Sequence, residues 1–206
     1  MTRESRPEAS PKREQILAGA RALFLELGYE RASVDAIAAR AGVSKATVYN
    51  HFRDKEALFL ASFGAETEGL RQKFHAVLET PTGDIEGDLR TIGTCLLGLI
   101  AAPGQVMRHR TAVAEADRFP ELGQRLHECG QAVGRARMAR YFARAGELGL
   151  LEVHDPMDAA IDFASLCVHD LQQALLLGRI DRVDDAAIAA HVERAVRTFL
   201  RAYLPR

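Results

Sequence analysis

The sequence predicts an all-α protein in which a small three-helix domain precedes a larger helical domain. Apolar residues recur every three or four positions along most of the 206 residues, which is the spacing of amphipathic helices. Alternating apolar and polar residues bounded by hairpin signals, as expected of half-buried strands, are not evident in the sequence. The domain boundary is expected near residue 58, where short helices give way to long ones.

The first helix is expected to begin at Ser10 and Pro11, a capping residue followed by one whose fixed φ suits the first helical position. Residues 1–9 are expected to form a flexible tail before it. The helix should continue to Gly28, with an inner face made of Ile16, Leu17, Ala20, Leu23, Phe24 and Leu27.

Two short helices around a tight turn are predicted between Ser33 and Phe59. Ser33 and Ser44 each precede a helix, where a side-chain oxygen can accept a hydrogen bond from a backbone N–H that otherwise lacks a partner. Gly42 falls in the turn, where a residue without Cβ readily adopts a positive φ. This spacing is typical of a helix-turn-helix.

The second of these helices has an apolar inner face and an outer face suited to DNA. Val48 and Phe52 are four residues apart, so both can point toward the domain core. Small side chains on the other face allow close approach to base edges, and lysine and asparagine supply hydrogen-bond donors. This outer face is expected to carry Lys45, Ala46, Thr47, Tyr49, Asn50 and His51.

Residues Arg13 to Ser62 resemble the DNA-binding domain of the TetR family of transcriptional regulators. The resemblance is carried in register by Gly28-Tyr29, Val34-Asp35-Ala36-Ile37-Ala38, Ala41-Gly42-Val43-Ser44, Thr47-Val48-Tyr49-Asn50-His51-Phe52 and Asp54-Lys55-Glu56-Ala57-Leu58. It implies that the helix after Ser44 enters the major groove and that the helix after Ser33 points its N-terminus at a phosphate. It also implies that Tyr49, His51 and Lys55 contact the DNA backbone. The predicted DNA-binding domain spans residues 10–58, and its DNA-binding residues are Ser33, Ser44, Lys45, Ala46, Thr47, Tyr49, Asn50, His51 and Lys55.

Residues 59–206 are predicted to form a helical domain for effector binding and dimerisation. Within it, Ala114 to Gly130 resembles the C-terminal domain of one TetR subgroup, where this segment lies among the helices of a ligand pocket. Pro120 should start or bend a helix because it cannot donate a backbone hydrogen bond. Breaks between helices are expected near Thr80–Gly83, Ala102–Gly104, Phe119–Pro120 and Val153–Pro156.

The family resemblance also implies a small-molecule effector, bound between about Leu70 and Gly149. Apolar walls with few polar groups favour a small hydrophobic or amphipathic ligand. The candidate ligand-binding residues, each of which also suits a core edge or a solvated helix face, are His75, Cys95, Met107, His109, His127 and Gln131.

The last two helices, 156–177 and 184–204, are candidates for self-association because each carries a wide apolar stripe. A two-fold dimer would place two recognition helices on one side of DNA. It would therefore read a palindromic operator with half-sites about 34–36 Å apart, or a multiple of that distance. The alternative is that both stripes complete the core of one chain. The stripes consist of Ile161, Ala164, Val168, Leu171 and Leu175, and of Ile188, Val192, Val196, Phe199 and Leu200.

The composition fits a regulator better than a general nucleic-acid coat protein, since the formal net charge is −1. Residues 1–56 hold 10 basic and 8 acidic residues, so affinity should depend on a few well-aimed contacts and on paired copies. A cytoplasmic location without a membrane partner is expected, because neither a signal peptide nor a membrane span is evident. The odd number and wide spacing of Cys95, Cys129 and Cys167 favour reduced thiols.

These features predict a ligand-responsive transcriptional regulator, in the first place a repressor that binds a double-stranded palindromic operator as a dimer and is released by a hydrophobic effector. A transcriptional activator, a metal-responsive regulator of the same fold, and a helical interaction module without DNA binding are the alternatives. Catalysis, a cofactor and a bound metal are not predicted, because G-x-S-x-G, H-E-x-x-H and glycine-rich phosphate motifs do not occur in the sequence.

Overall fold

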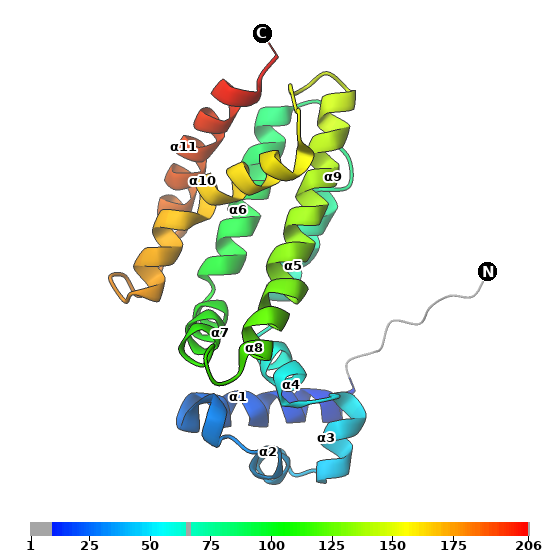
Figure 1. The fold of residues 1–206 in the computed structure, drawn as a ribbon, viewed down its shortest axis with the longest axis vertical. Coiled ribbons are helices and arrows are strands. Elements are labelled where there is room, and N and C mark those ends of the chain that lie inside the picture. Colours follow the sequence, from blue (N-terminus) through cyan, green and yellow to red (C-terminus); the bar gives the residue numbers. More distant parts are fainter. Residues whose placement is uncertain (1–9, 65–66, 206) are drawn as a thin grey trace, which may run out of the picture. The chain divides into compact units, whose positions relative to one another are not determined.

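The computed structural model describes residues 10–64 and 67–205, which divide into two compact units (Figure 1). The first unit contains residues 10–64 and 111–123, and the second contains residues 67–110 and 124–205. All regular secondary structure in these ranges is helical, so the predicted all-α fold is confirmed. The predicted tail, residues 1–9, lies outside the described residues.

Four helices form most of the first unit: α1 (Pro11–Arg31), α2 (Val34–Arg40), α3 (Lys45–His51) and α4 (Lys55–Ser62). Pro11 opens α1 as predicted, but the side chain of Ser10 makes no capping hydrogen bond. Instead, the backbone carbonyl of Ser10 accepts from the N–H of Arg13 at 2.7 Å. The prediction of a side-chain cap at Ser10 is therefore wrong, because the N–H that a cap would satisfy already has a backbone partner.

Helix α1 kinks at Gly28, where φ is +79°, a conformation that glycine adopts without steric cost. The kink places Tyr29 in the core, where it is 1% exposed. Its ring lies edge-to-face with that of Phe59, with 5.2 Å between the centroids, and stacks with that of Phe24 at 5.9 Å. These aromatic contacts join α1 to α4.

The segment 111–123 packs with the first unit, although the sequence assigns it to the second domain. The ring of Phe119 lies edge-to-face with that of Tyr29, with 5.3 Å between the centroids. Arg118 forms an ion pair with Glu30, so a second contact of different chemistry joins this segment to the end of α1.

The second unit is built mainly from long helices, and Figure 1 shows α6, α9, α10 and α11 gathered into one bundle. Helix α6 packs against α5, α10 and α11, and α10 packs against α9 and α11. A new helix begins at or just after each predicted break, and Pro120 starts a helix as expected. The boundary between the units falls within α7 and within α8, so each contributes residues to both units. The bounds are α5 (Glu68–Val77), α6 (Ile85–Ala101), α7 (Pro103–Ala114), α8 (Pro120–Leu126), a π-helical segment (His127–Ala132), α9 (Val133–Glu147), α10 (Pro156–Leu176) and α11 (Asp185–Tyr203).

Three phenylalanine rings lie at the centre of this bundle. The ring centroid of Phe199 is 5.2 Å from that of Phe142 and 5.1 Å from that of Phe163, and all three side chains are at most 1% exposed. Gly93 lets α6 approach its neighbours closely, because a Cβ there would lie 2.8 Å from a methyl group of Val192.

The apolar stripe of α11 completes the core of its own chain. Its five residues, Ile188, Val192, Val196, Phe199 and Leu200, are at most 9% exposed. The prediction that these side chains form a subunit interface is therefore wrong, because α6 and α10 already cover this face. On α10, Val168 and Leu175 are also buried, whereas Ile161 remains 37% exposed.

The three cysteines are unpaired thiols; Cys95 and Cys167 are buried and Cys129 is exposed. Over the described ranges, no single helix is long and apolar enough to cross a membrane, and α6 with α7 meets that test only as a bent pair.

Candidate nucleic-acid interface

Local hydrogen bonds define both helices of the helix-turn-helix. The Ser33 hydroxyl oxygen accepts from the N–H of Ala36 at 3.1 Å, and that of Ser44 accepts from the N–H of Thr47 at 3.1 Å. The two predicted caps are therefore confirmed. Gly42, in the turn between the two helices, has φ +66°. The N–H of its neighbour Val43 donates a hydrogen bond to the Ala38 carbonyl at 3.0 Å.

Helix α3 has the two faces that the sequence predicts. Val48 is 1% exposed and Phe52, just after the helix, is 5% exposed, so both anchor α3 to the domain core. On the opposite face Tyr49 is 47% exposed. A half-exposed aromatic ring with a hydroxyl group is suited to contact a phosphate or a sugar. Of the other predicted contact residues on α3, Lys45, Ala46 and Asn50 are exposed, and Thr47 and His51 are half-buried.

Two polar side chains of α3 already have partners within the protein. The Lys45 ammonium lies 2.9 Å from a carboxylate oxygen of Asp35, in the first turn of α2. This hydrogen bond and the charge of Asp35 raise the pKa of Lys45. The hydroxyl groups of Thr47 and Ser44 are 2.8 Å apart. These contacts restrict the orientations of the Lys45 and Thr47 side chains in the DNA-free protein.

Lys55 turns toward the end of α1. Its ammonium group donates to the Glu30 carbonyl at 3.0 Å and lies 4.5 Å from the centroid of the Tyr29 ring. Burial lowers the pKa of Lys55. A phosphate contact by Lys55 stays a prediction, and the structure gives this residue a second task in tying α4 to α1.

Two charged residues near α3 were missed by the sequence analysis. Asp35 lies ten positions before Lys45 and approaches it only because the turn folds α2 back on α3. The guanidinium of Arg13 lies 5.2 Å from the ring centroid of Phe52. Both residues lie within the range that resembles the TetR family, but the resemblance assigned neither a role in DNA binding, and no local signal marked these contacts.

The six candidate ligand residues lie in the second unit. His75 on α5 and His109 on α7 are half-buried, and burial is the largest cause that lowers the pKa of each. Cys95 on α6 is 1% exposed, and burial raises its pKa. Met107 is 38% exposed on α7. In the π-helical segment, His127 and Gln131 come into contact, with 3.3 Å between Nδ1 and Oε1.

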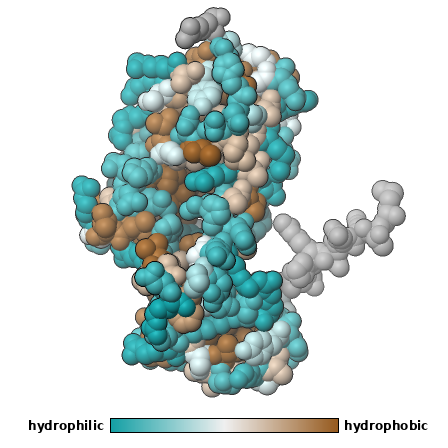
Figure 2. All heavy atoms as spheres, viewed as in Figure 1, coloured by the Kyte–Doolittle hydropathy of each residue, from teal (hydrophilic) through white to brown (hydrophobic). Residues whose placement is uncertain are grey.

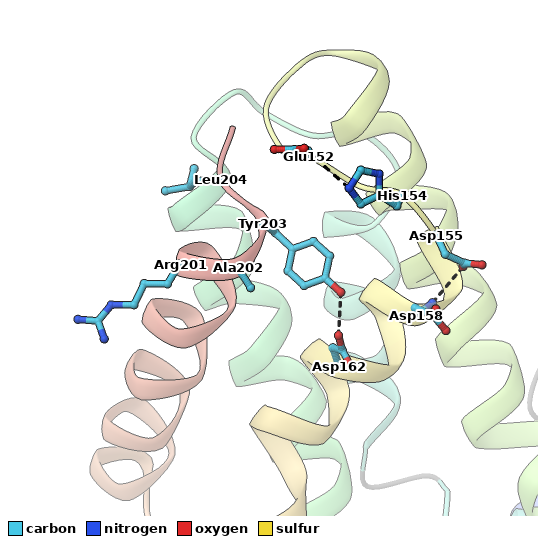
Figure 3. Close-up of a pocket in the computed structure, with 9 residues that line it drawn as sticks. All are labelled: Glu152, His154, Asp155, Asp158, Asp162, Arg201, Ala202, Tyr203 and Leu204. Carbon is cyan, nitrogen blue, oxygen red and sulfur yellow. Dashed lines mark hydrogen bonds and ion pairs between the residues drawn. The ribbon is translucent and has the colours of Figure 1, made fainter. Parts of the chain in front are cut away.

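A surface hollow of about 590 Å³ lies elsewhere in the second unit, beside the start of α10 and the end of α11 (Figure 3). Figure 3 shows Tyr203 pointing at Asp162, to which its hydroxyl donates at 2.7 Å. None of the six candidate ligand residues is in its lining. Among the residues with described positions, no group of three His, Cys, Asp or Glu side chains is placed to hold a metal ion.

A capped helix-turn-helix with an exposed second helix, joined to a larger helical unit, defines a helix-turn-helix transcriptional regulator. Comparison with known families agrees with this class. Residues 16–62 match the model for bacterial regulatory proteins of the tetR family, and residues 87–205 match the AefR-like transcriptional repressor C-terminal domain. The chain therefore belongs to the TetR family of DNA-binding transcriptional regulators.

Two solved structures align with almost the whole chain, and a curated relative aligns with about half of it. The structure of a TetR-family regulator from Mesorhizobium loti is 27% identical, with a TM-score of 0.80 over 97% of this chain and 100% of that chain. The flavonoid-responsive regulator FrrA is 34% identical, with a TM-score of 0.75 over 95% of this chain and 98% of that chain. An HTH-type transcriptional regulator of Mycobacterium bovis is 35% identical over 113 residues, 55% of this chain and 52% of that protein. This chain thus spans about half the length of the mycobacterial relative.

Proposed function

We propose that this protein is a ligand-responsive repressor that binds a palindromic operator as a homodimer and leaves it when a small hydrophobic effector binds. The observation that supports it most is the outer face of α3, where Lys45, Ala46, Tyr49 and Asn50 are exposed while Val48 is buried. A helix whose polar face is exposed and whose apolar face is anchored in the core can enter a major groove without unfolding its domain.

Each side chain on this face has a proposed task. Lys45 and Asn50 donate hydrogen bonds to base edges, and Ala46 and Thr47 keep the helix close enough for those bonds to form. Tyr49 and His51 contact phosphate oxygens, which fixes the register of the protein on the duplex. Ser33, Ser44 and Lys55 contribute through the two helix starts and the start of α4, where N–H groups and an ammonium favour anions.

The proposed dimer uses the outer face of α10 and α11, which the core leaves uncovered. On α10, Met157 is 42% exposed, and Ile161 and Leu166 are each 37% exposed. Apolar side chains also gather on the surface at the end of α10 (Figure 2), where Leu177 is 72% exposed. A second hollow of about 480 Å³ lies between the two helices, beside Leu166 and Thr198. Burying such a patch against its two-fold copy removes apolar surface from water.

The dimer is tested by native mass spectrometry at micromolar concentration. The wild type is expected at twice the chain mass, and Leu166→Glu at the mass of one chain, because a carboxylate would be buried against its copy. Leu148→Glu is the matched control, since Leu148 is 52% exposed in the loop after α9 and should leave the dimer intact. A monomeric wild type would rule out the proposed arrangement.

The proposed effector is small and largely apolar. The relative FrrA is flavonoid-responsive by name and 34% identical, so planar aromatic compounds are the first class to screen. A ligand should raise the melting temperature of the protein and weaken operator binding, because it stabilises the state that it binds. Tighter operator binding with ligand would favour the alternative of an activator. As a DNA-binding regulator, the protein is proposed to act in the cytoplasm.

The role of α3 is tested by selecting bound sequences from a random duplex pool. The wild type should enrich a palindrome, and the double variant Lys45→Ala/Tyr49→Ala should lose the enrichment. Lys73→Ala is the control, because Lys73 is an exposed lysine of α5 in the second unit. Equal enrichment by the double variant would show that α3 does not read the operator.

A further inference from the structure

An ion pair connects the two helices of the helix-turn-helix directly beside the proposed DNA surface. A carboxylate oxygen of Asp35 lies 2.9 Å from the ammonium nitrogen of Lys45. The side chains are 68% and 52% exposed, respectively, so both remain accessible to a large ligand. Lys45 is the first residue of α3, so the pair sits where that helix would first meet a base or a phosphate.

The neighbours of Lys45 extend this pair into a row across the outer surface. Tyr49 follows Lys45 by four residues, which places the two side chains on the same face of α3 one turn apart. The Ser44 hydroxyl fixes the start of the helix just before Lys45. Asp35, Lys45 and Tyr49 therefore present a carboxylate, an ammonium and a phenol in sequence from α2 to α3.

A carboxylate beside this lysine has two consequences for DNA binding. Proteins bind DNA of any sequence because their cationic side chains displace counterions from the phosphates. An ammonium group that is already paired with a carboxylate displaces fewer counterions and so contributes less to this binding. The carboxylate also repels phosphates at short range. Both effects lower affinity for any duplex. Neither effect prevents the Lys45 ammonium from donating a hydrogen bond to a guanine edge, because that bond depends on the direction in which the side chain points.

We infer that Asp35 is a specificity-determining residue: it holds the Lys45 ammonium toward a base edge of the operator and withholds it from the phosphates of unrelated DNA. The inference rests on the proposed reading of DNA by α3. Asp35 acts through Lys45 and is in this sense a positioning residue. Its removal should make binding stronger on unrelated DNA and less selective.

The same unit contains a matched ion pair that does not involve α3. Glu26 of α1 and Arg40 of α2 are 2.8 Å apart, with side chains 56% and 44% exposed. Glu26→Gln and Asp35→Asn change the charge of the domain by the same amount. A general electrostatic effect would therefore appear in both variants. An effect that depends on Lys45 would appear in Asp35→Asn but not in Glu26→Gln.

The experiment measures the affinity of the full-length protein for its selected operator and for an unrelated duplex of equal length over a series of salt concentrations. For Asp35→Asn, the expected result is a salt slope on the unrelated duplex about 0.9 steeper than that of the wild type. The ratio of variant to wild-type affinity for that duplex should therefore rise about 3.5-fold as the salt concentration is lowered from about 0.2 M to about 0.05 M, which is the effect of one added phosphate contact. Operator affinity should change less, so the ratio of operator to unrelated affinity falls. Glu26→Gln should keep the wild-type ratio.

A double variant shows whether Asp35 acts through Lys45. In a Lys45→Gln background, Asp35→Asn should leave the ratio unchanged. The inference is overturned if the ratio falls there as well, if Glu26→Gln lowers it equally, or if Asp35→Asn leaves both slope and ratio at wild-type values. If Asp35→Asn does not fold, as judged by its melting curve, Asp35→Ser replaces it because serine suits a first helical turn. A wild type that binds neither duplex would instead refute DNA reading by α3.

Discussion

The phenol of Tyr29 donates a hydrogen bond to a carboxylate oxygen of Glu56, 2.8 Å away, and so joins the end of α1 to α4. The same ring contacts Phe119 of the segment 111–123 and lies under the ammonium of Lys55. Burial, followed by the hydrogen bond to Glu56, raises the pKa of the phenol far above its ordinary value. Tyr29 is therefore a neutral hydrogen-bond donor at neutral pH.

Removing this hydroxyl should destabilise the first unit. Tyr29→Phe keeps the aromatic contacts and loses a hydrogen bond to a charged group, so we expect a loss of about 1.5–3 kcal/mol in the free energy of unfolding. Urea unfolding followed by circular dichroism measures it. Tyr203→Phe is the comparison, because its hydroxyl also meets a carboxylate, that of Asp162, but in an exposed position. If both variants lose the same free energy of unfolding, burial does not strengthen the hydrogen bond of Tyr29.

The turn of the helix-turn-helix depends on the backbone conformation of Gly42. A Cβ there meets no atom within 4 Å, so the strain in Gly42→Ala comes only from φ +66°. We expect a loss of about 1 kcal/mol in stability. Gly134→Ala is the opposite case, since Gly134 lies within α9, also with open space around its Cβ position. That variant should gain up to about 1 kcal/mol from helix propensity. Melting curves of the two variants that shift in the same direction would refute this account.

Asp88 organises the polar interior of the second unit. It is 5% exposed and accepts hydrogen bonds from the Thr82 N–H, the Thr82 hydroxyl and the Tyr141 hydroxyl, each at 2.8 Å. Asp88→Ala leaves these donors without their acceptor, so we expect a loss of about 3 kcal/mol or more in the free energy of unfolding. Chemical denaturation measures it. Asp170→Ala, at an exposed position of α10, should change stability by less than about 0.5 kcal/mol. A similar small effect at Asp88 would show that its hydrogen bonds contribute little.

The three thiols should differ in reactivity. Cys129 is exposed, whereas Cys95 and Cys167 are buried, and burial raises the pKa of Cys167 to about 12. One thiol per native chain should react quickly with an aromatic disulfide reagent at pH 8, and three after denaturation. Three fast thiols in the native protein would contradict the burial of Cys95 and Cys167.

The buried thiols also give stability a pH dependence. Folding raises the pKa of Cys95 and Cys167 above the ordinary value of 9.0, so the folded chain holds these protons more tightly than the unfolded chain. Their contribution to stability is full below pH 9.0 and decreases as the pH rises from there toward about 12. Cys167→Ser should flatten the decrease seen in unfolding experiments over this range. An unchanged profile would argue against a role for this thiol.

The elements that the sequence predicted best are those encoded by neighbouring residues. Ser33, Gly42 and Ser44 each act within a few positions of their place in the chain, so both helix starts and the turn were predictable. The stripe on α11 was visible as well, but periodicity identifies an apolar face and not the surface that covers it. Its assignment to a subunit interface failed for this reason.

Long-range electrostatic contacts were beyond sequence reasoning. Arg118 pairs with Glu30 from 88 positions away, and no local pattern marks either residue as half of a pair. Asp35 meets Lys45 only through the geometry of the turn. The exposed face of α3 could be predicted from the sequence. The contact of the Asp35 carboxylate with Lys45, the first residue of that helix, could not.

Two chains are proposed to read one palindrome through α3. The most direct measurement is the mass of the complex, with its dissociation constant, on the selected palindrome and on a duplex that contains one half-site. We predict two chains on the palindrome and much weaker binding to the half-site, because pairing raises affinity without new contacts. One chain per duplex with equal affinity for both would contradict the account.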